Sequence, residues 1–242
     1  MSGFNLDDDY SNRKVIVPKE ILHPSYFSAD GTKLPSVTTV LSIINKPYLV
    51  KWANKLGLQG TNIEEYNRGI TGIGTLTHAR IQAFLEGVPI DDSGYTDREI
   101  NISLACFNGF MKWYNSHSVK RILTEKSLVS EKHKFGGTID AFLLVDDVPT
   151  IIDFKTSNQI SQEYYSQLSA YDILLKESDY NPEKAAILRL PKIDPEMTSI
   201  EPTFEYVEKT IDELQNHREI FIKALDLYKA INPLQKPFIK EM

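Results

Sequence analysis

The pattern of apolar and polar residues predicts helices in the first half of the chain. Between residues 36 and 114, apolar side chains recur every three or four positions, which is the spacing of one helix face. Capping residues or a proline open several of these segments, and glycines close two of them. We therefore expect helices over about residues 36–44, 47–57, 74–85 and 96–114.

Two of these segments carry apolar stripes that we expect to face the core. In the second helix the stripe consists of Leu49, Trp52, Ala53 and Leu56. The fourth helix follows a capping box at residues 96–99. Its stripe consists of Ile100, Leu104, Phe107, Met111 and Tyr114.

The apolar period changes at about residue 120, where strands are predicted. The expected strands cover residues 121–125, 138–145 and 150–155, then 185–190 and 203–207, with helices over 161–175 and after residue 210. Helices followed by a β-β-β-α-β order indicate one α/β domain with a mixed sheet flanked by helices. Residues 1–34 show no sustained period, and we expect an irregular or partly ordered N-terminal arm.

Composition narrows the class of protein. The 242 residues are 41% hydrophobic and 25% charged, which suits a globular domain and excludes a disordered, collagen-like or coiled-coil chain. No apolar run approaches the ~20 residues of a membrane span. Cys106 is the single cysteine, which excludes an internal disulfide and a four-thiolate iron–sulfur cluster. The first residues resemble neither a signal nor a transit peptide, so we expect an intracellular, cytoplasmic protein.

The net charge of −6 argues against a protein that coats nucleic acid through bulk charge. It leaves open an enzyme that holds a strand in a local basic groove, because a metal site itself requires clustered carboxylates.

The candidate chemistry lies in the two central strands. Asp140 interrupts an otherwise apolar strand, and Asp153 and Lys155 share one face of the next because strand side chains alternate. A buried carboxylate without a partner is costly, and a divalent cation is one partner that stabilises such a cluster. A buried ion pair without any chemistry remains the alternative.

These residues belong to a longer pattern that resembles the PD-(D/E)XK nuclease superfamily, in its RecB-type exonuclease branch. Its motifs are Asp140 and Asp153-Phe154-Lys155 on the predicted strands, followed by Gln167-Leu168-Ser169-Ala170-Tyr171 on the next predicted helix. Residues 72–78, which end in His78, resemble the turn and helix that carry the metal-binding histidine of that branch. Residues 35–41 are similar to the opening of mitochondrial genome maintenance exonucleases and related phage exonucleases. The resemblance spans about residues 35–190.

The chain departs from the family pattern at two positions. Ile139 stands where the family name has proline, and Asp153 is the shorter of the two permitted acids. Neither departure removes a ligand oxygen.

The resemblance implies a restriction-endonuclease-like fold. It implies a single nuclease domain over residues 35–242, with an N-terminal helical part at 35–118 and the sheet core and C-terminal helix at 119–242. It also implies Mg²⁺ or Mn²⁺ held by His78, Asp140, Asp153 and the backbone carbonyl of Phe154, a donor set that suits these ions.

The resemblance gives further residues a role. Lys155 would orient or deprotonate the attacking water and offset charge in the transition state, and Glu125 would help to hold metal-bound water. Gln167 would brace Lys155, and Tyr171 would lie near the DNA. Three of the candidate residues also have a plainer explanation. Glu125 can face solvent, His78 can pack in the core, and Tyr171 can belong to an aromatic core stripe.

Ser36 and Thr38, at the start of the first predicted helix, could receive a substrate phosphate. Helix capping explains Ser36 equally well.

The function that follows is metal-dependent hydrolysis of DNA by an exonuclease that prefers single strands or free ends. We place such an enzyme in a bacterial or phage-infected cell, with DNA as its partner and no membrane association. The alternatives are a structure-selective endonuclease on the same core, a non-catalytic DNA-binding module, or an unrelated protein with a structural ion pair.

Overall fold

A five-stranded mixed sheet forms the centre of the computed structural model, which describes residues 14–17, 24–44 and 46–234. The strands are β5 (Val119–Ser130), β6 (Phe135–Val145), β7 (Val148–Lys155), β8 (Lys184–Arg189) and β9 (Glu205–Thr210), in that spatial order. Only β7 and β8 pair in parallel, and the other neighbours are antiparallel. The mixed sheet confirms the predicted fold class.

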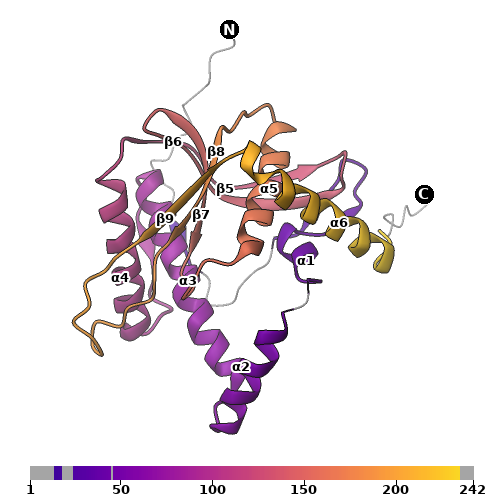
Figure 1. The fold of residues 1–242 in the computed structure, drawn as a ribbon. Coiled ribbons are helices and arrows are strands. Elements are labelled where there is room, and N and C mark those ends of the chain that lie inside the picture. Colours follow the sequence, from indigo (N-terminus) through magenta and orange to yellow (C-terminus); the bar gives the residue numbers. More distant parts are fainter. Residues whose placement is uncertain (1–13, 18–23, 45, 235–242) are drawn as a thin grey trace, which may run out of the picture.

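Helices cover both faces of this sheet. One face packs against α1 (Val37–Leu41), α5 (Gln162–Lys176) and α6 (Gln215–Ile231), and the other against α3 (Ile63–Glu86) and α4 (Asp97–Tyr114) (Figure 1). A one-turn 3₁₀ segment (Asp212–Leu214) precedes α6. Each face of the sheet has its own apolar core, and alternate residues of β7 pack into one or the other. Ile151 lies in the core on the α5 side, and Ile152 and Phe154 lie in the core on the α4 side. Asp153 and Lys155 therefore share the α5 side, as their spacing predicts.

The helix α2 (Pro47–Leu58) projects from the body together with the start of α3 (Figure 1). Leu49 is 43% and Trp52 is 36% exposed, so the expectation that this stripe faces the core is wrong. The third helix also begins at Ile63 rather than near residue 74. Its first turns lie outside the core, so no buried stripe marked them in the sequence.

The buried stripe of α4 is rotated from the predicted one. Ile102, Cys106, Phe110 and Trp113 are buried, whereas Leu104 is 38% exposed. This helix contacts both the sheet and α3, so it is apolar over two adjacent sides, and Phe107 packs on α3 at Phe84. Periodicity alone could not choose between these sides.

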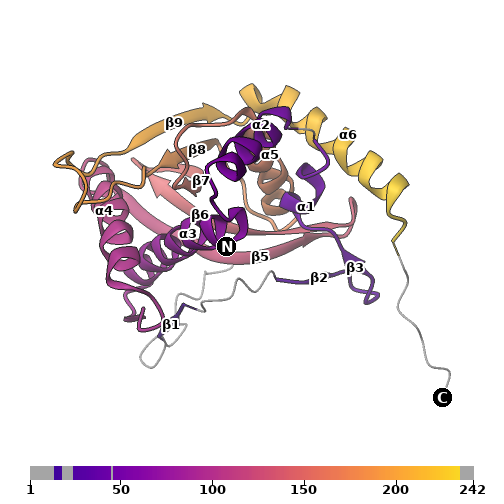
Figure 2. The same cartoon turned by 90° about the horizontal axis from the view of Figure 1, so that it is seen from below.

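The described residues of the N-terminal arm contain short strands of two residues each. The strand β1 (Val15–Ile16) pairs in parallel with β4 (Ile90–Asp91). The strands β2 (Tyr26–Phe27) and β3 (Lys33–Leu34) form a hairpin beside β5 (Figure 2). Two-residue strands are too short for a period to reveal them.

Within the described residues, no helix combines the length and the apolar character that crossing a bilayer requires.

Candidate metal centre and active site

The strands β6 and β7 separate at the residues that carry the acids. Their pairing runs from the turn as far as Ala141 and Ile152. Beyond that point an Asp140 side-chain oxygen, Oδ2, accepts a hydrogen bond of 2.9 Å from the backbone N–H of Phe154. A carboxylate thus takes the place of a strand partner and is fixed at the mouth of the opening.

Two further side chains converge on Asp140 from other elements. His78, on α3, places Nδ1 3.6 Å from Asp140 Oδ1 and 3.9 Å from Glu125 Oε1. The ring of Phe154 meets the His78 ring edge-on, with centroids 5.9 Å apart. One ligand atom from each of His78, Glu125 and Asp140 lies within 4.8 Å of the others, a spacing that suits one metal ion.

We call His78, Glu125 and Asp140 the triad. Glu125 reaches the other two residues from a backbone conformation that is unusual for a non-glycine residue. Its φ is +46°, in the left-handed region that a non-glycine residue adopts at a cost of ~1–3 kcal/mol. Such local strain persists where the surrounding structure enforces it, and it is common at functional sites. The carboxylate of Glu125 lies 3.9 Å from His78 Nδ1 and its side chain is 29% exposed, so Glu125 is not a freely solvent-facing strand residue.

A second group of polar side chains lies on the α5 side. Asp153 is fully buried, and its Oδ2 lies 2.6 Å from Lys155 Nζ with no other polar partner. Gln167 donates from Nε2 to Asp153 Oδ1 at 2.9 Å, and Lys155 Nζ donates to Gln167 Oε1 at 3.3 Å. Gln167 Nε2 also donates to the hydroxyl of Tyr171 at 2.7 Å. The four side chains form one connected network.

Burial and the repulsion of neighbouring carboxylates make Glu125 and Asp153 hard to ionise. Burial raises the pKa of Glu125 to about 8, and the nearby Asp140 adds to this effect. Burial likewise raises the pKa of Asp153 to about 6, although Lys155 opposes the change. The pKa of Asp140 lies below its usual value despite burial, because His78 and Lys155 stabilise its charge.

The two basic groups of the site carry the complementary shifts. Burial alone would lower the pKa of His78, but Asp140 and Glu125 raise it to about 9. Burial also opposes the charge of Lys155, and Asp153 and Asp140 outweigh it, so its pKa is raised. Without a metal, the positive charge of protonated His78 therefore offsets the negative charge of the neighbouring carboxylates.

The donors fit a divalent cation. Carboxylate oxygens suit Mg²⁺ and Mn²⁺, and the imidazole nitrogen of His78 favours Mn²⁺ of the two. A cation also relieves the repulsion that raises the pKa of Glu125. Of the predicted ligands, His78 and Asp140 belong to the triad together with Glu125, and the carboxylate of Asp153 contacts Lys155 and Gln167.

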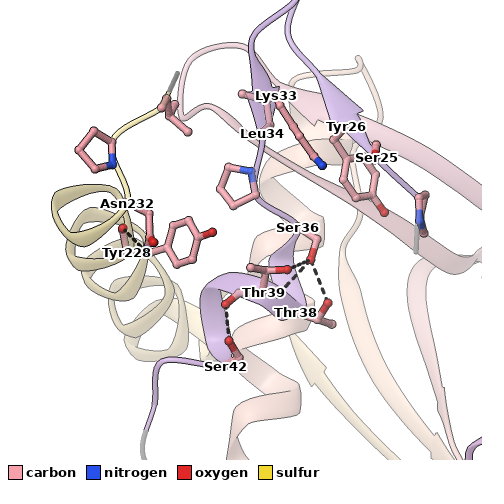
Figure 3. Close-up of a pocket in the computed structure, with 14 residues that line it drawn as sticks. Ser25, Tyr26, Lys33, Leu34, Ser36, Thr38, Thr39, Ser42, Tyr228 and Asn232 are labelled. Atoms are coloured by element: carbon pink, nitrogen blue, oxygen red, sulfur yellow. Dashed lines mark hydrogen bonds between the residues drawn. The ribbon is translucent and has the colours of Figure 1, made fainter. Parts of the chain in front are cut away.

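Ser36 and Thr38 do not join this cluster. Ser36 Oγ accepts a hydrogen bond of 2.9 Å from the backbone N–H of Thr39 and therefore caps α1. Both residues line a separate groove of about 780 Å³ between the β2–β3 hairpin, α1 and the end of α6 (Figure 3). Tyr171 is also 96% buried, so its hydroxyl reaches the site only through Gln167.

Sequence reasoning missed several residues around the triad. A cavity of about 600 Å³ opens over His78, Glu125 and Lys155. Its other polar lining residues are Thr71, Thr75, Gln82, Thr156, Ser157 and Lys192. A usable signal existed for Lys192, which follows β8, because the carboxyl ends of the parallel strands β7 and β8 meet at one edge of the sheet.

Comparisons with known proteins add distant structural likenesses. No protein-family model and no curated protein matches the chain. Among solved structures, an alkaline exonuclease (LHK-Exo) from Laribacter hongkongensis aligns over 81% of this chain and 89% of its own, at 11% identity and a TM-score of 0.36.

Its complex with dAMP gives 12% identity over 82% of this chain and 90% of that chain, with a TM-score of 0.36. A phage-related exonuclease from Haemophilus somnus 129PT gives 13% identity over 81% and 93%, with a TM-score of 0.35. Likenesses this distant carry no argument about function, which has to come from the site.

Proposed function

We propose that this protein is a metal-dependent nuclease that hydrolyses DNA phosphodiester bonds. The observation that carries the proposal is the convergence of His78, Glu125 and Asp140 within 4.8 Å, next to the buried Asp153–Lys155 pair. The four acidic or imidazole groups come from α3, β5, β6 and β7, and the fold brings them together beside a cavity that His78, Glu125 and Lys155 line. A purely structural ion pair would not require the histidine, the strained Glu125 or the opening between β6 and β7.

His78, Glu125 and Asp140 would hold Mg²⁺ or Mn²⁺, with Asp153 and the backbone carbonyl of Phe154 as further donors. The ion supplies Lewis-acid stabilisation of phosphate charge and lowers the pKa of bound water.

Lys155 supplies a positive charge beside the reacting phosphate. Because its pKa is raised, Lys155 stays protonated at neutral pH, and its Nζ donates hydrogen bonds rather than accepting a proton. A protonated lysine can orient the attacking water and stabilise charge that develops on the phosphate oxygens. Gln167, bound to both Lys155 and Asp153, would hold the ammonium in this position.

We further propose that the substrate is single-stranded DNA or a DNA end. The α2–α3 projection offers exposed aromatic side chains, with the rings of Trp52 and Tyr66 5.9 Å apart. Unpaired bases stack on such side chains at ~1–3 kcal/mol each. The net charge of −6 disfavours a grip on long duplex by surface charge, which supports a local channel.

The test is digestion of 5′- and 3′-labelled single-stranded, blunt duplex and circular single-stranded DNA with Mg²⁺, Mn²⁺ or EDTA. We expect rapid metal-dependent loss of linear single strands, slower loss of duplex and resistance of circles. Cutting of circles at the rate of linear strands would instead assign an endonuclease. Binding without cleavage under every metal condition would assign a DNA-binding module and refute the enzyme.

A further inference from the structure

The cavity over the triad contains a second lysine that the chemistry described so far does not use. Lys192 follows β8 and is half-buried, and its Nζ donates to the backbone oxygen of Thr156 at 2.9 Å and to its Oγ1 at 2.7 Å. No carboxylate of the described residues lies within 4.0 Å of this ammonium. Lys155, on the same wall, is paired with Asp153 at 2.6 Å. A carboxylate therefore neutralises the charge of Lys155, whereas no neighbouring carboxylate neutralises that of Lys192.

An uncompensated charge that is partly removed from water is unfavourable. Burial lowers the pKa of Lys192, which shows that its surroundings do not replace the lost hydration. The two Thr156 oxygens are neutral acceptors and stabilise a cation less than a carboxylate does. An anion in the cavity would remove this deficit.

The surroundings of Lys192 suit a phosphate group. The hydroxyls of Thr75 and Thr156 line the same cavity. Thr156 Oγ1 accepts from Lys192 and keeps its own O–H for a phosphate oxygen, whereas Thr75 Oγ1 donates to the backbone oxygen of Thr71 at 3.2 Å and would exchange this bond for one to the phosphate. Gly74 leaves room on this wall, because a Cβ there would lie 3.2 Å from Thr156 Oγ1. His78, Glu125 and Lys155 line the same cavity as Lys192, so one bound strand could contact the triad and Lys192 together.

We propose that Lys192, with the hydroxyls of Thr75 and Thr156, binds a substrate phosphate adjacent to the one that is hydrolysed. This inference rests on the proposed nuclease function and adds a position that fixes the register of the strand. The bound group is either an internal phosphodiester or a terminal phosphate, since both present the same charged oxygens.

The first experiment compares Lys192→Met and Lys192→Arg with the wild type on a linear single-stranded oligonucleotide. Charged hydrogen bonds of this kind correspond to roughly 10- to 100-fold in affinity. We expect Lys192→Met to raise KM by that factor with a smaller effect on kcat, and Lys192→Arg to recover most of the loss. Fluorescence anisotropy in EDTA should show the same weakening of oligonucleotide binding without turnover.

The control is Lys223→Met, which removes the same charge from the exposed face of α6, where Lys223 pairs with Glu219. This variant should match the wild type in KM and in binding. Thermal melting of both methionine variants shows whether either change unfolds the protein.

The second experiment makes one linkage at a time neutral with methylphosphonate, on the 5′ or the 3′ side of the cleaved bond. The wild type should lose roughly 10- to 100-fold in kcat/KM at one of these positions, and Lys192→Met should lose nothing further there. Substrates with terminal phosphate or hydroxyl distinguish the two sources of the anion. If only the terminal phosphate matters, the site selects strand ends.

Two results would overturn the inference separately from the proposed function. Metal-dependent hydrolysis by Lys192→Met with unchanged KM and an unchanged methylphosphonate penalty would make Lys192 a structural tether of Thr156. Absence of hydrolysis by the wild type on every substrate would refute the nuclease itself, and the phosphate site with it.

Discussion

At the scale of single residues, a substitution of Lys155 distinguishes two interpretations of the Asp153–Lys155 pair. The pair belongs either to an active site or to a purely structural ion pair. Lys155→Ala should lower kcat by at least ~100-fold, because the positive charge beside the phosphate is lost. The melting temperature should fall only modestly, since the pKa of Asp153 is already raised to about 6 and its carboxyl can take a proton instead. Steady-state kinetics and thermal melting on one preparation measure both effects.

A control variant is available on α5, the helix that also carries Gln167. Lys176→Ala removes one of the two cationic partners of another buried acid, Asp172, which lies 2.9 Å from Lys176 and 3.3 Å from Arg218. It should lower stability without lowering kcat. Near wild-type cleavage by Lys155→Ala, together with a clear loss of stability, would instead make the Asp153–Lys155 pair structural.

At the scale of elements, the arrangement of the site depends on close contacts between short segments. Gly136, at the start of β6, lies under the ring of Tyr26 from β2, and an added Cβ would come within 2.3 Å of Tyr26 Cγ. Tyr26 in turn bonds Thr138 through its hydroxyl at 2.8 Å, two residues before Asp140. The β2–β3 hairpin therefore packs directly on β6, the strand that carries Asp140 of the triad.

Gly136→Ala should destabilise the protein by ~1–3 kcal/mol, because the Tyr26 ring has to move. Gly69→Ala is the matched control, since Gly69 lies within α3 with no atom near its missing Cβ. That change should stabilise the protein by ~0.5–1 kcal/mol through helix propensity. Urea unfolding of both variants measures the two signs, and equal free energies of unfolding would contradict the packing argument.

At the scale of the whole molecule, the site couples stability to pH. The folded-state pKa values of Glu125 (about 8), Asp153 (about 6) and His78 (about 9) lie above their ordinary values of 4.5, 3.8 and 6.5. A group with a raised pKa stabilises the fold at low pH, and this contribution is lost as the pH rises through the folded value. The contribution of Asp153 is lost by about pH 6, and those of Glu125 and His78 are lost up to about pH 8 and pH 9, so the metal-free protein should still lose stability between pH 6 and pH 9.

A bound cation reverses this dependence, because it requires deprotonated ligands. The melting temperature in EDTA should fall from pH 6 to pH 9, and the increase caused by Mg²⁺ should grow over the same range. Asp140→Asn should abolish the response to Mg²⁺, whereas Asp226→Asn on the exposed side of α6 should keep it. A metal response that is independent of pH, or that survives in Asp140→Asn, would place the cation elsewhere.

The sequence by itself determined the order of the elements, the mixed sheet and the central acids. Alternation along a strand is a local property, so the shared face of Asp153 and Lys155 and the position of Asp140 on a buried strand followed from spacing alone. The inward stripe predicted for α2 was wrong, because the depth at which a helix lies depends on its neighbours rather than on its own period. In α4, Phe107, Met111 and Tyr114 of the predicted stripe do pack against the core, whereas Leu104 is 38% exposed.

Only the tertiary structure decided which groups meet. It placed Glu125 with His78 and Asp140, bound Asp153 to Lys155 and Gln167, separated Ser36 and Thr38 into another groove, and brought Lys192 to the cavity. These residues lie far apart along the chain, and their convergence depends on sheet register, on the opening between β6 and β7 and on the packing of α3 across β5. Local periodicity contains no information about such long-range contacts, so the sequence could name candidate ligands but could not assemble the site.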